Sequence, residues 1–490
     1  MRLHHTIMRR WTRALSTLRQ TASNDASLSR TAAVVGQPTR ATHPHLFVSA
    51  DELTPGVSRD EYAARRRALV AAMPANSVAI FAAAPALKFH GTVIPAGRYR
   101  QDADFAYLTG VNQPDCLALV ERGDTERDVR YVLVVPEHSE RYMVWDGERI
   151  NAAAGESIFG ADASFEANER AVADVADMIT RAAGGVYVDM EKVESTLLKR
   201  AFGALGRDAY ASERLRPAKY LTHKLRWRKS DAEIELIQKS VDLDISAFKR
   251  ALATSKVGST EAAVMAHHEA ACRIGGADRL AYPSVVGSGA AACVVHYHPN
   301  DKILRDGELL LMDAGCELNG YVSDITRTWP VNGKWTTAQL DVYSAVLDAH
   351  VACQRAARAD GATSLADIHR LSVEVLAHGL SKLLPNSDAR SLIRSGAYTK
   401  YYPHSIGHWL GADTHDVPTV GIATPFELNT VFTIEPGLYF PPNDPDVPKE
   451  LRGIGVRIED DFVVDRGGAC ALSAALPVDP DAIAALATSS

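Results

Sequence analysis

The chain has 490 residues, a length that suits two domains better than one. Its 46% apolar and 23% charged residues are ordinary for a soluble globular protein, and no apolar run reaches the roughly 18 residues needed to span a membrane. The six cysteines are scattered without a CxxC pair, which favours free thiols in a reducing compartment and excludes a disulfide framework or zinc knuckle.

The net charge of −7 is unevenly distributed. Residues 1–50 hold seven Arg and one acidic residue, so they contribute +6 and leave −13 for the rest. On a helical wheel of the first 24 residues, apolar side chains cluster on one side and Arg on the other. This composition is typical of a mitochondrial transit peptide, with a disordered basic tail or a surface-lying helix as alternatives. We therefore exclude residues 1–42 from the fold and expect a protein of the mitochondrial matrix with no nucleic-acid partner.

From residue 58 onward the pattern becomes that of an α/β domain, which we expect over residues 43–222. Ser58 and Glu61 have the spacing of a capping box and open a predicted helix over residues 61–73. Strand-like runs follow at 77–83, 116–120, 131–135 and 186–189, separated by helical stretches such as 167–184.

A second domain is expected over residues 223–476, followed by a tail over 477–490. Two further capping boxes, Ser230 with Glu233 and Thr336 with Gln339, open long helical patterns. Predicted helices cover 230–252, 260–274, 336–359 and 364–384, and predicted strands cover 430–440 and 455–464. The order of helices, β-hairpin, helices and strands predicts an α+β fold.

Two aspartates fall within the predicted hairpin LLLMDAGCELNGYVSDITRTWP, residues 309–330. Asn319-Gly320 has the residue types of a two-residue turn, so Asp313 should pair with Thr326. Because side chains on one face recur every second residue, Asp313 and Asp324 become diagonal neighbours about 7–8 Å apart. Two converging carboxylates repel unless a proton or cation lies between them. The hairpin therefore predicts a shared ligand, most simply a metal, against the alternative of turn or edge residues.

Further candidate ligands follow the hairpin. His404, His408 and His415 lie within twelve residues of one another. Glu435 ends an apolar strand, and alternation places Arg457 and Glu459 on one face of the next. Each alone is more often a core histidine or a solvent-facing glutamate. Together with the two Asp they form a site rich in carboxylates and free of thiolate, which favours Mn²⁺, with Co²⁺, Fe²⁺ or Zn²⁺ also possible. The negative charges of four carboxylates balance the positive charges of two divalent ions.

Three other motifs are set aside as structural. HHEAAC at 267–272 approximates the zinc-protease motif HExxH, but Cys272 replaces the second His, and its helix reads more simply as a packed amphipathic one. The glycines at 287 and 289 approximate a dinucleotide-binding loop without its following helix and acidic residue. Val285 stands where a nucleophile elbow would need Gly.

The motifs DAGCELNGYVSDITRTWPVNGKW, PHSIGHWLGADTHDVP, TIEPGLY and GVRIEDD together resemble the pita-bread metallopeptidases, specifically the aminopeptidase P branch. GQPTRATHPHL, ELTPGVSRDEYAARR and YRQDADFAYLTGVNQPD are similar to its mitochondrial members, of the Xaa-Pro aminopeptidase and intermediate-cleaving types. The resemblance covers about residues 43–475. It implies an aminopeptidase P N-terminal α/β domain followed by a pita-bread catalytic domain.

The resemblance also implies roles for individual residues. The implied metal ligands are Asp313, Asp324, His408, Glu435 and Glu459. Asp324 and Glu459 would be shared by two divalent ions, with Mn²⁺ expected. The implied roles of the remaining residues are substrate binding and stabilisation of the tetrahedral intermediate by His296, His404 and His415, proton transfer by Glu435, and orientation of Glu459 by Arg457.

The implied activity is hydrolysis of the first peptide bond, releasing one N-terminal residue from peptides or from presequence-processed mitochondrial proteins. We also expect a homo-oligomer, a dimer or tetramer. A prolidase-like dipeptidase, metal-free creatinase-type chemistry and a non-catalytic protein-binding module are the alternatives. Retention of all five ligands speaks against the last two, and the mitochondrial-type N-terminal motifs favour an aminopeptidase over a dipeptidase.

Overall fold

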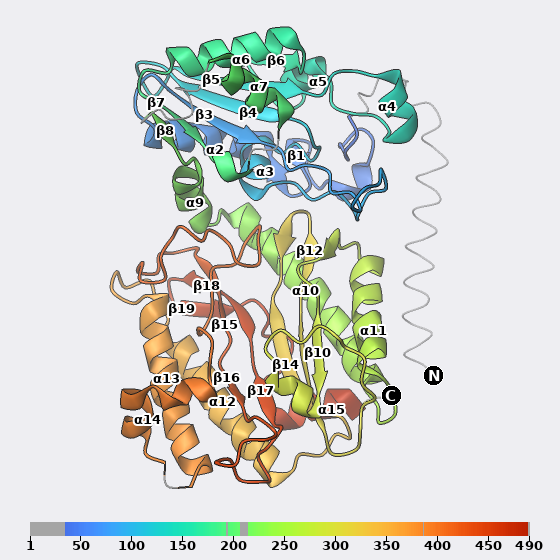
Figure 1. The fold of residues 1–490 in the computed structure, drawn as a ribbon, viewed down its shortest axis with the longest axis vertical. Helices are drawn as coiled ribbons and strands as arrows, with labels where there is room; N and C mark the ends of the chain where they lie inside the picture. Colours follow the sequence, from blue (N-terminus) through green and yellow to red (C-terminus); the bar gives the residue numbers. More distant parts are fainter. Residues whose placement is uncertain (1–34, 193–194, 206–213, 386, 489–490) are drawn as a thin grey trace.

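The computed structural model describes residues 35–192, 195–205, 214–385 and 387–488. The amphipathic segment of the predicted transit peptide therefore lies outside the described residues. The described chain forms two halves that lie one above the other in Figure 1, joined by α9 (Lys219–Trp227). None of the described helices is both long and apolar enough to cross a bilayer.

The N-terminal half is built on a mixed six-stranded sheet with the order β6-β5-β4-β3-β7-β8. Its strands are β3 (Ser77–Ala82), β4 (Leu117–Arg122), β5 (Val129–Val135), β6 (Ala163–Glu166), β7 (Gly185–Val188) and β8 (Leu215–Arg216). Its helices are α2 (Arg59–Ala72), α3 (Ala103–Thr109), α4 (Glu140–Trp145), α5 (Ala152–Ser157), α6 (Glu169–Arg181) and α7 (Thr196–Ala204). A small hairpin of β1 (Glu52–Thr54) and β2 (Val57–Ser58) precedes α2.

The sheet is buried on both faces, as its nearly continuous apolar strands require. Val78 and Ile80 of β3 belong to the core formed with α6 and α7. Ala79 and Phe81 of the same strand belong to the core on the opposite face, where α2 and α3 lie. The predicted α/β character of this half is confirmed.

Capping residues start the long helices as the sequence predicts, with one difference. The Ser230–Glu233 and Thr336–Gln339 boxes are both complete. Ser58 accepts a hydrogen bond from the Glu61 backbone, but the box is only half formed. The Glu61 carboxylate instead binds Arg65 at 2.6 Å and the Ser230 hydroxyl at 2.7 Å, because the second half of the chain packs beside it.

The C-terminal half places helices on either side of a set of small antiparallel sheets (Figure 1). Its helices are α10 (Asp231–Thr254), α11 (Glu261–Ile274), α12 (Thr337–Ala356), α13 (Leu365–Leu383), α14 (Ala389–Ser395) and α15 (Pro480–Thr488). Its strands are β9 (Arg279–Leu280), β10 (Val285–Ser288), β11 (Leu309–Ala314), β12 (Cys316–Leu318), β13 (Tyr321–Val322), β14 (Ile325–Pro330), β15 (Val431–Ile434), β16 (Gly437–Tyr439), β17 (Gly455–Arg457), β18 (Asp460–Asp465) and β19 (Gly468–Ala471). This is the predicted α+β, pita-bread arrangement.

The central hairpin has the predicted register. Asp313 pairs with Thr326 across β11 and β14, and Leu318 pairs with Tyr321 across the turn. Asn319 and Gly320 adopt φ values of +52° and +79°, the left-handed pair that a tight hairpin turn needs. Both aspartates therefore share one face of the hairpin.

Two predicted strands are each broken into two in the structure, and the breaks carry functional candidates. The run 430–440 divides into β15, which pairs with β18, and β16, which pairs with β17. The break falls at Glu435-Pro436, because Pro has no N–H to donate to a ladder. The run 455–464 divides at Ile458-Glu459. Glu435 and Glu459 thus stand at strand ends.

A buried ion cluster joins the two halves. Arg226 of α9 is 3% exposed and donates to Asp104 of α3 at 2.5 Å and to Asp416 in the second half. Lys229 reaches the other oxygen of Asp416 at 3.0 Å, and Arg226 also lies 3.2 Å from Asp413. The charges of three separate segments are therefore neutralised within one largely buried cluster.

Replacement of Arg226 by Ala is expected to reduce the free energy of unfolding by about 3–5 kcal/mol, because Asp104 and Asp416 would remain buried without their shared cation. Urea unfolding followed by circular dichroism measures this. The matched control is Arg228→Ala, since Arg228 forms only a surface pair with Glu427 at 3.3 Å and should cost at most about 1 kcal/mol. Equal effects of the two changes would contradict a joining role for the cluster.

Candidate metal centre

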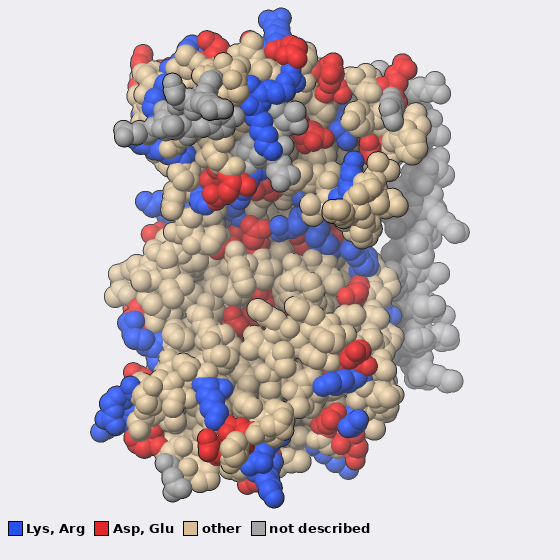
Figure 2. Space-filling model, in the orientation of Figure 1, with Lys and Arg blue, Asp and Glu red and all other residues tan. Residues whose placement is uncertain are grey.

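Five side chains from four separate segments converge on one cavity of about 530 Å³ in the C-terminal half. They are Asp313 from β11, Asp324 just before β14, His408 from the loop before β15, Glu435 after β15 and Glu459 before β18. In the space-filling view, this half is hollowed and a few acidic side chains are visible within the hollow (Figure 2). All five residues are those that the resemblance implied.

His408 is oriented with one ring nitrogen toward the carboxylates. Its Nδ1 lies 3.2 Å from the Trp409 carbonyl oxygen, which can only accept, so Nδ1 carries the proton. Nε2 lies 3.3 Å from Asp324 and 3.7 Å from Glu435. Neutral His408 would therefore present the lone pair of Nε2 to the site, as a metal ligand must.

Tyr282 bridges the two aspartates of the hairpin. Its hydroxyl lies 2.6 Å from Asp313 Oδ1 and also contacts Asp324 Oδ1. A hydroxyl has a single proton, so it can donate to only one of the two carboxylates. Burial raises the pKa of Asp313, the charge of Arg457 opposes this shift, and the charge of Asp324 adds to it. Tyr282 therefore holds the two carboxyl groups close together.

Arg457 provides the positive charge beside this cluster, but its carboxylate partner differs from the one predicted. Its guanidinium donates to Asp313 and, at 2.8 Å, to the Tyr439 hydroxyl. It reaches Glu459 only through Thr326, whose hydroxyl lies 3.1 Å from Arg457 Nε and 2.7 Å from Glu459 Oε2. The expected direct orientation of Glu459 by Arg457 is replaced by this relay, because Thr326 stands between them on β14.

The electrostatics of the cluster favour a bound positive charge. Burial raises the pKa of Glu435 to about 7 despite His408 and Arg457 nearby. Burial and the neighbouring carboxylates Asp324 and Glu435 raise the pKa of Glu459 well above its usual value. Burial alone would lower the pKa of His408, but the hydrogen bond and charge of Asp324 outweigh it and raise that pKa to about 9. Each shift shows that protons are drawn to a site with excess negative charge.

The donor set fits hard divalent ions. One atom from each of Asp324, His408 and Glu459 lies within 4.8 Å of the others, close enough for one ion to contact all three. The atoms presented are carboxylate oxygens and one imidazole nitrogen, with no sulfur. A divalent ion would balance the negative charge that these carboxylates bring together.

The three other predicted histidines divide into two groups. His296 and His415 line the cavity. The His415 ring lies beside that of His408, with 4.4 Å between the two ring centroids. His404 does not line it. Its Nδ1 donates to the Ser405 carbonyl at 2.8 Å and its Nε2 accepts from Tyr439 at 2.8 Å, with Glu435 3.8 Å away. Burial and the charge of Arg457 lower the pKa of His404 to about 4, so its ring is neutral.

Several residues of the site were not predicted from the sequence. Tyr282 lies in a loop with no periodic pattern, and Thr326 was considered only as a hairpin partner. His298 lines the cavity beside His296, two residues away in the same segment. Arg100 comes from the N-terminal half, and only tertiary packing brings it to the cavity.

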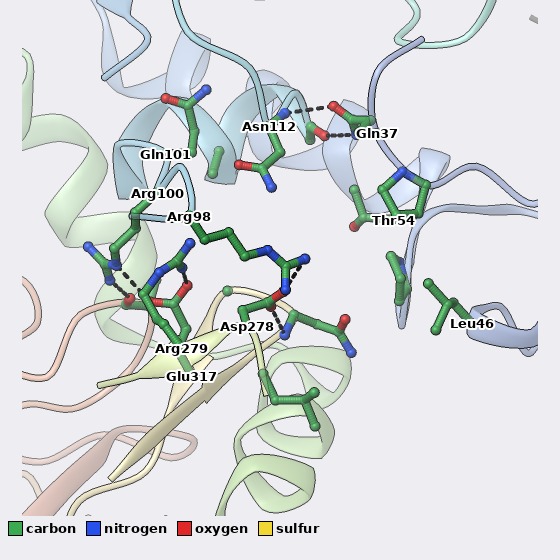
Figure 3. A pocket seen from close by; sticks show the side chains of 18 of the residues that line it. Gln37, Leu46, Thr54, Arg98, Arg100, Gln101, Asn112, Asp278, Arg279 and Glu317 are labelled. Atoms are coloured by element: carbon green, nitrogen blue, oxygen red, sulfur yellow. Dashed lines mark hydrogen bonds and ion pairs between the residues drawn. The ribbon is translucent and has the colours of Figure 1, made fainter. Parts of the chain in front are cut away.

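Arg100 also lines a second cavity, of about 340 Å³, between the two halves (Figure 3). There its guanidinium binds Glu317 at 2.6 Å, and Arg98 pairs with Asp278 at 2.9 Å. Arg279 also binds Glu317. The second cavity holds none of the five candidate ligands, and its acidic groups are already paired with arginines, so it is not the metal centre.

Comparisons with known proteins agree with this geometry. Residues 235–466 match the model of metallopeptidase family M24, and residues 62–187 match the aminopeptidase P N-terminal domain. The chain is 35% identical over 465 residues to the mitochondrial intermediate cleaving peptidase 55 of Arabidopsis thaliana, covering 94% of this chain and 88% of that protein. It is 34% identical to human Xaa-Pro aminopeptidase 3, covering 90% of this chain and 88% of that protein.

Solved structures are similar over the same length. Zinc-substituted aminopeptidase P of Escherichia coli in complex with product superposes with a TM-score of 0.82 at 31% identity, covering 88% of this chain and 98% of that one. Proline aminopeptidase P II of Yersinia pestis gives a TM-score of 0.81 at 33% identity, with coverage of 88% and 99%.

Binding of divalent metal is expected to release more than one proton per chain at pH 7, because His408 is then protonated and Glu435 is about half protonated. Metal affinity should accordingly rise from pH 6 to pH 9 as these groups lose their protons. Isothermal titration with Mn²⁺ in buffers of different ionisation enthalpy measures the protons released. Affinity that is independent of pH, with no proton release, would contradict this arrangement.

Proposed function

The chain belongs to metallopeptidase family M24, in which it is a metal-dependent aminopeptidase, and we propose that it releases a single residue from the N-terminus of peptides or of mitochondrial proteins that have lost their presequence. The observation that carries the proposal is the convergence of four carboxylates and the inward-facing Nε2 of His408 in one cavity. The relatives' names support both an Xaa-Pro and an intermediate-cleaving specificity.

We assign Asp313, Asp324, His408, Glu435 and Glu459 to the binding of two divalent ions, with Mn²⁺ the best match to the oxygen-rich donors. When bound, such ions supply an activated water and positive charge for the developing oxyanion. The protein's contribution is to hold the donors in place. Arg457 fixes Asp313, Thr326 fixes Glu459, and the carboxylate of Asp461 accepts the backbone N–H of Asp324 at 3.0 Å.

Glu435 is suited to transfer a proton during hydrolysis of the peptide bond. A pKa of about 7 lets its carboxylate take a proton at neutral pH and give it to the departing amine. His404, held by Ser405 and Tyr439 3.8 Å from Glu435, limits the positions that this carboxylate can adopt.

His296 and His415 are suited to hold the substrate. Among the described residues, neither ring forms a hydrogen bond that would compete with a ligand in the cavity. Burial and the charge of His408 lower the pKa of His415, so its ring is neutral and can donate one N–H to a substrate carbonyl oxygen.

A peptide panel varying the first two residues, with Mn²⁺ added and products read by mass spectrometry, tests the activity. We expect loss of one N-terminal residue from peptides of three or more residues, and a rate reduced more than about 100-fold in Asp324→Ala, because a ligand is removed while the fold is kept. Asp341→Ala, an exposed carboxylate on α12, is the matched control and should keep the wild-type rate.

The panel also distinguishes the alternatives. Cleavage confined to Xaa-Pro dipeptides would indicate the prolidase-like activity instead. Complete absence of cleavage would favour a protein-binding module. Unchanged activity in Asp324→Ala would rule out the assigned ligand set.

We further propose a mitochondrial location and a homo-oligomer. The Arg-rich, acid-poor N-terminus and the mitochondrial relative in Arabidopsis support the first. The second is supported by exposed apolar side chains in the segment 87–94, where Leu87 is 73% and Val93 is 79% exposed.

The location is tested by import of the full-length chain, tagged at its C-terminus, into isolated mitochondria. Protease-protected, shortened protein is expected, because the basic N-terminal segment would be recognised and removed. A variant with Arg2, Arg9, Arg10 and Arg13 changed to Gln should remain outside. Exclusion of the unaltered full-length chain would contradict the proposal.

A further inference from the structure

The HExxH-like motif of α11 is not part of the catalytic cavity, but its side chains meet another buried ligand. His268 and Cys272 are four residues apart and so lie on the same face of α11. Asp244, from the neighbouring helix α10, packs against them. The sequence alone does not reveal this third member, because it lies on another helix, 24 residues before His268.

The geometry is that of a compact three-ligand group. His268 Nε2 lies 2.6 Å from Asp244 Oδ1, and Cys272 Sγ lies 3.8 Å from the same nitrogen. One donor atom of each residue lies within 4.8 Å of the others. All three side chains are fully buried. A carboxylate, an imidazole and a thiol thus face one another without access to water.

The hydrogen bond between His268 and Asp244 uses only one oxygen of the Asp244 carboxylate. Its Oδ2 atom is buried and has no hydrogen-bond partner. A buried carboxylate with an unused oxygen is costly unless it is neutralised or coordinated. Burial raises the pKa of Asp244, with the nearby charge of Asp324 adding to this and His268 and Ser323 opposing it. Asp244 therefore offers one buried carboxylate oxygen to a further partner.

A second buried thiol lies near this group, on the central hairpin. The Cys316 thiol of β12 is fully buried, donates to the Ser240 carbonyl oxygen of α10 at 3.4 Å, and packs in the same core cluster as Cys272. Because side chains alternate along the hairpin, Cys316 lies on the face opposite Asp313 and Asp324. The hairpin thus separates this group from the catalytic cavity.

We propose that Asp244, His268 and Cys272 form a structural site for a divalent transition ion of the Zn²⁺ class. One carboxylate and one thiolate balance the two charges of the ion, and the imidazole adds a neutral nitrogen donor. Binding would release the thiol proton of Cys272 and the proton shared by His268 and Asp244. The site would hold α10 and α11 together, and the burial of all three side chains keeps a substrate out.

Cobalt substitution distinguishes this site from the catalytic one, because a thiolate bound to Co²⁺ gives a charge-transfer absorption in the near ultraviolet that oxygen and nitrogen donors do not. The full-length protein is produced with Co²⁺ as the only added transition metal, so that the buried site can load during folding. We expect the absorption in the wild type and in Asp324→Ala, whose catalytic cluster is disabled. Absence of the absorption in folded wild-type protein would overturn the proposal.

Matched cysteine variants test the assignment. Cys272→Ser should lose the absorption and about one equivalent of tightly held metal per chain. Cys353→Ser should lose neither, because Cys353 is equally buried but bonds only to the Ile368 carbonyl, at 3.6 Å. If Cys272→Ser is insoluble, the wild-type spectrum alone decides. Equal loss in both variants, or retention in Cys272→Ser, would contradict the assigned ligands.

Discussion

Repulsion among four carboxylates gathered in one cavity governs how the catalytic half is built. Asp313, Asp324, Glu435 and Glu459 come from separate strand ends, so no local preference brings them together. Neutral groups fix three of them: the Tyr282 hydroxyl contacts both aspartates, and the Thr326 hydroxyl donates to Glu459 at 2.7 Å. Arg457 adds a permanent positive charge through its ion pair with Asp313. The rest of the charge must be balanced by protons or by metal ions, and burial together with this charge raises the pKa values of Asp313, Glu435 and Glu459.

The N-terminal half takes part in this arrangement through ionic contacts with the loop that carries His408 and His415. Arg226 binds Asp416, the residue after His415, while its other partner Asp104 belongs to α3. Arg100 reaches Asp413 at 2.9 Å from the same half. The segment 401–430, between α14 and β15, forms no helix or strand of its own, so these ion pairs add to its backbone hydrogen bonds with β15 in fixing it. The presence of an α/β domain ahead of the catalytic fold therefore has a physical consequence for the histidines of the cavity.

Features of the fold and of the site could be predicted from the sequence where they depend on residues close together in the chain. Asn319-Gly320 set the register of the hairpin, and the alternation of side chains then placed Asp313 and Asp324 on one face. The break at Glu435 has a local signal in Pro436, whereas the break at Glu459 depends on which strands pair in space. The partner of Arg457 was assigned incorrectly for the same reason: Thr326, on a strand more than a hundred residues earlier, stands between Arg457 and Glu459. Tyr282 and Arg226 carry no local signal, because their partners are distant in sequence.

The central hairpin separates two chemical environments by alternation alone. Asp313 and Asp324 face the cavity, where oxygen donors favour hard, exchangeable ions. Cys316 faces α10 on the other side, near the buried group of Asp244, His268 and Cys272. The mixed donors of that group would suit a softer ion held permanently. A one-residue slip of register would exchange the two faces and place thiols in the catalytic cavity. The left-handed turn at Asn319-Gly320 and the close approach at Gly315, where a Cβ would lie 2.0 Å from the Ser323 carbonyl oxygen, oppose such a slip. The backbone of this hairpin thus determines which chemistry each face can carry.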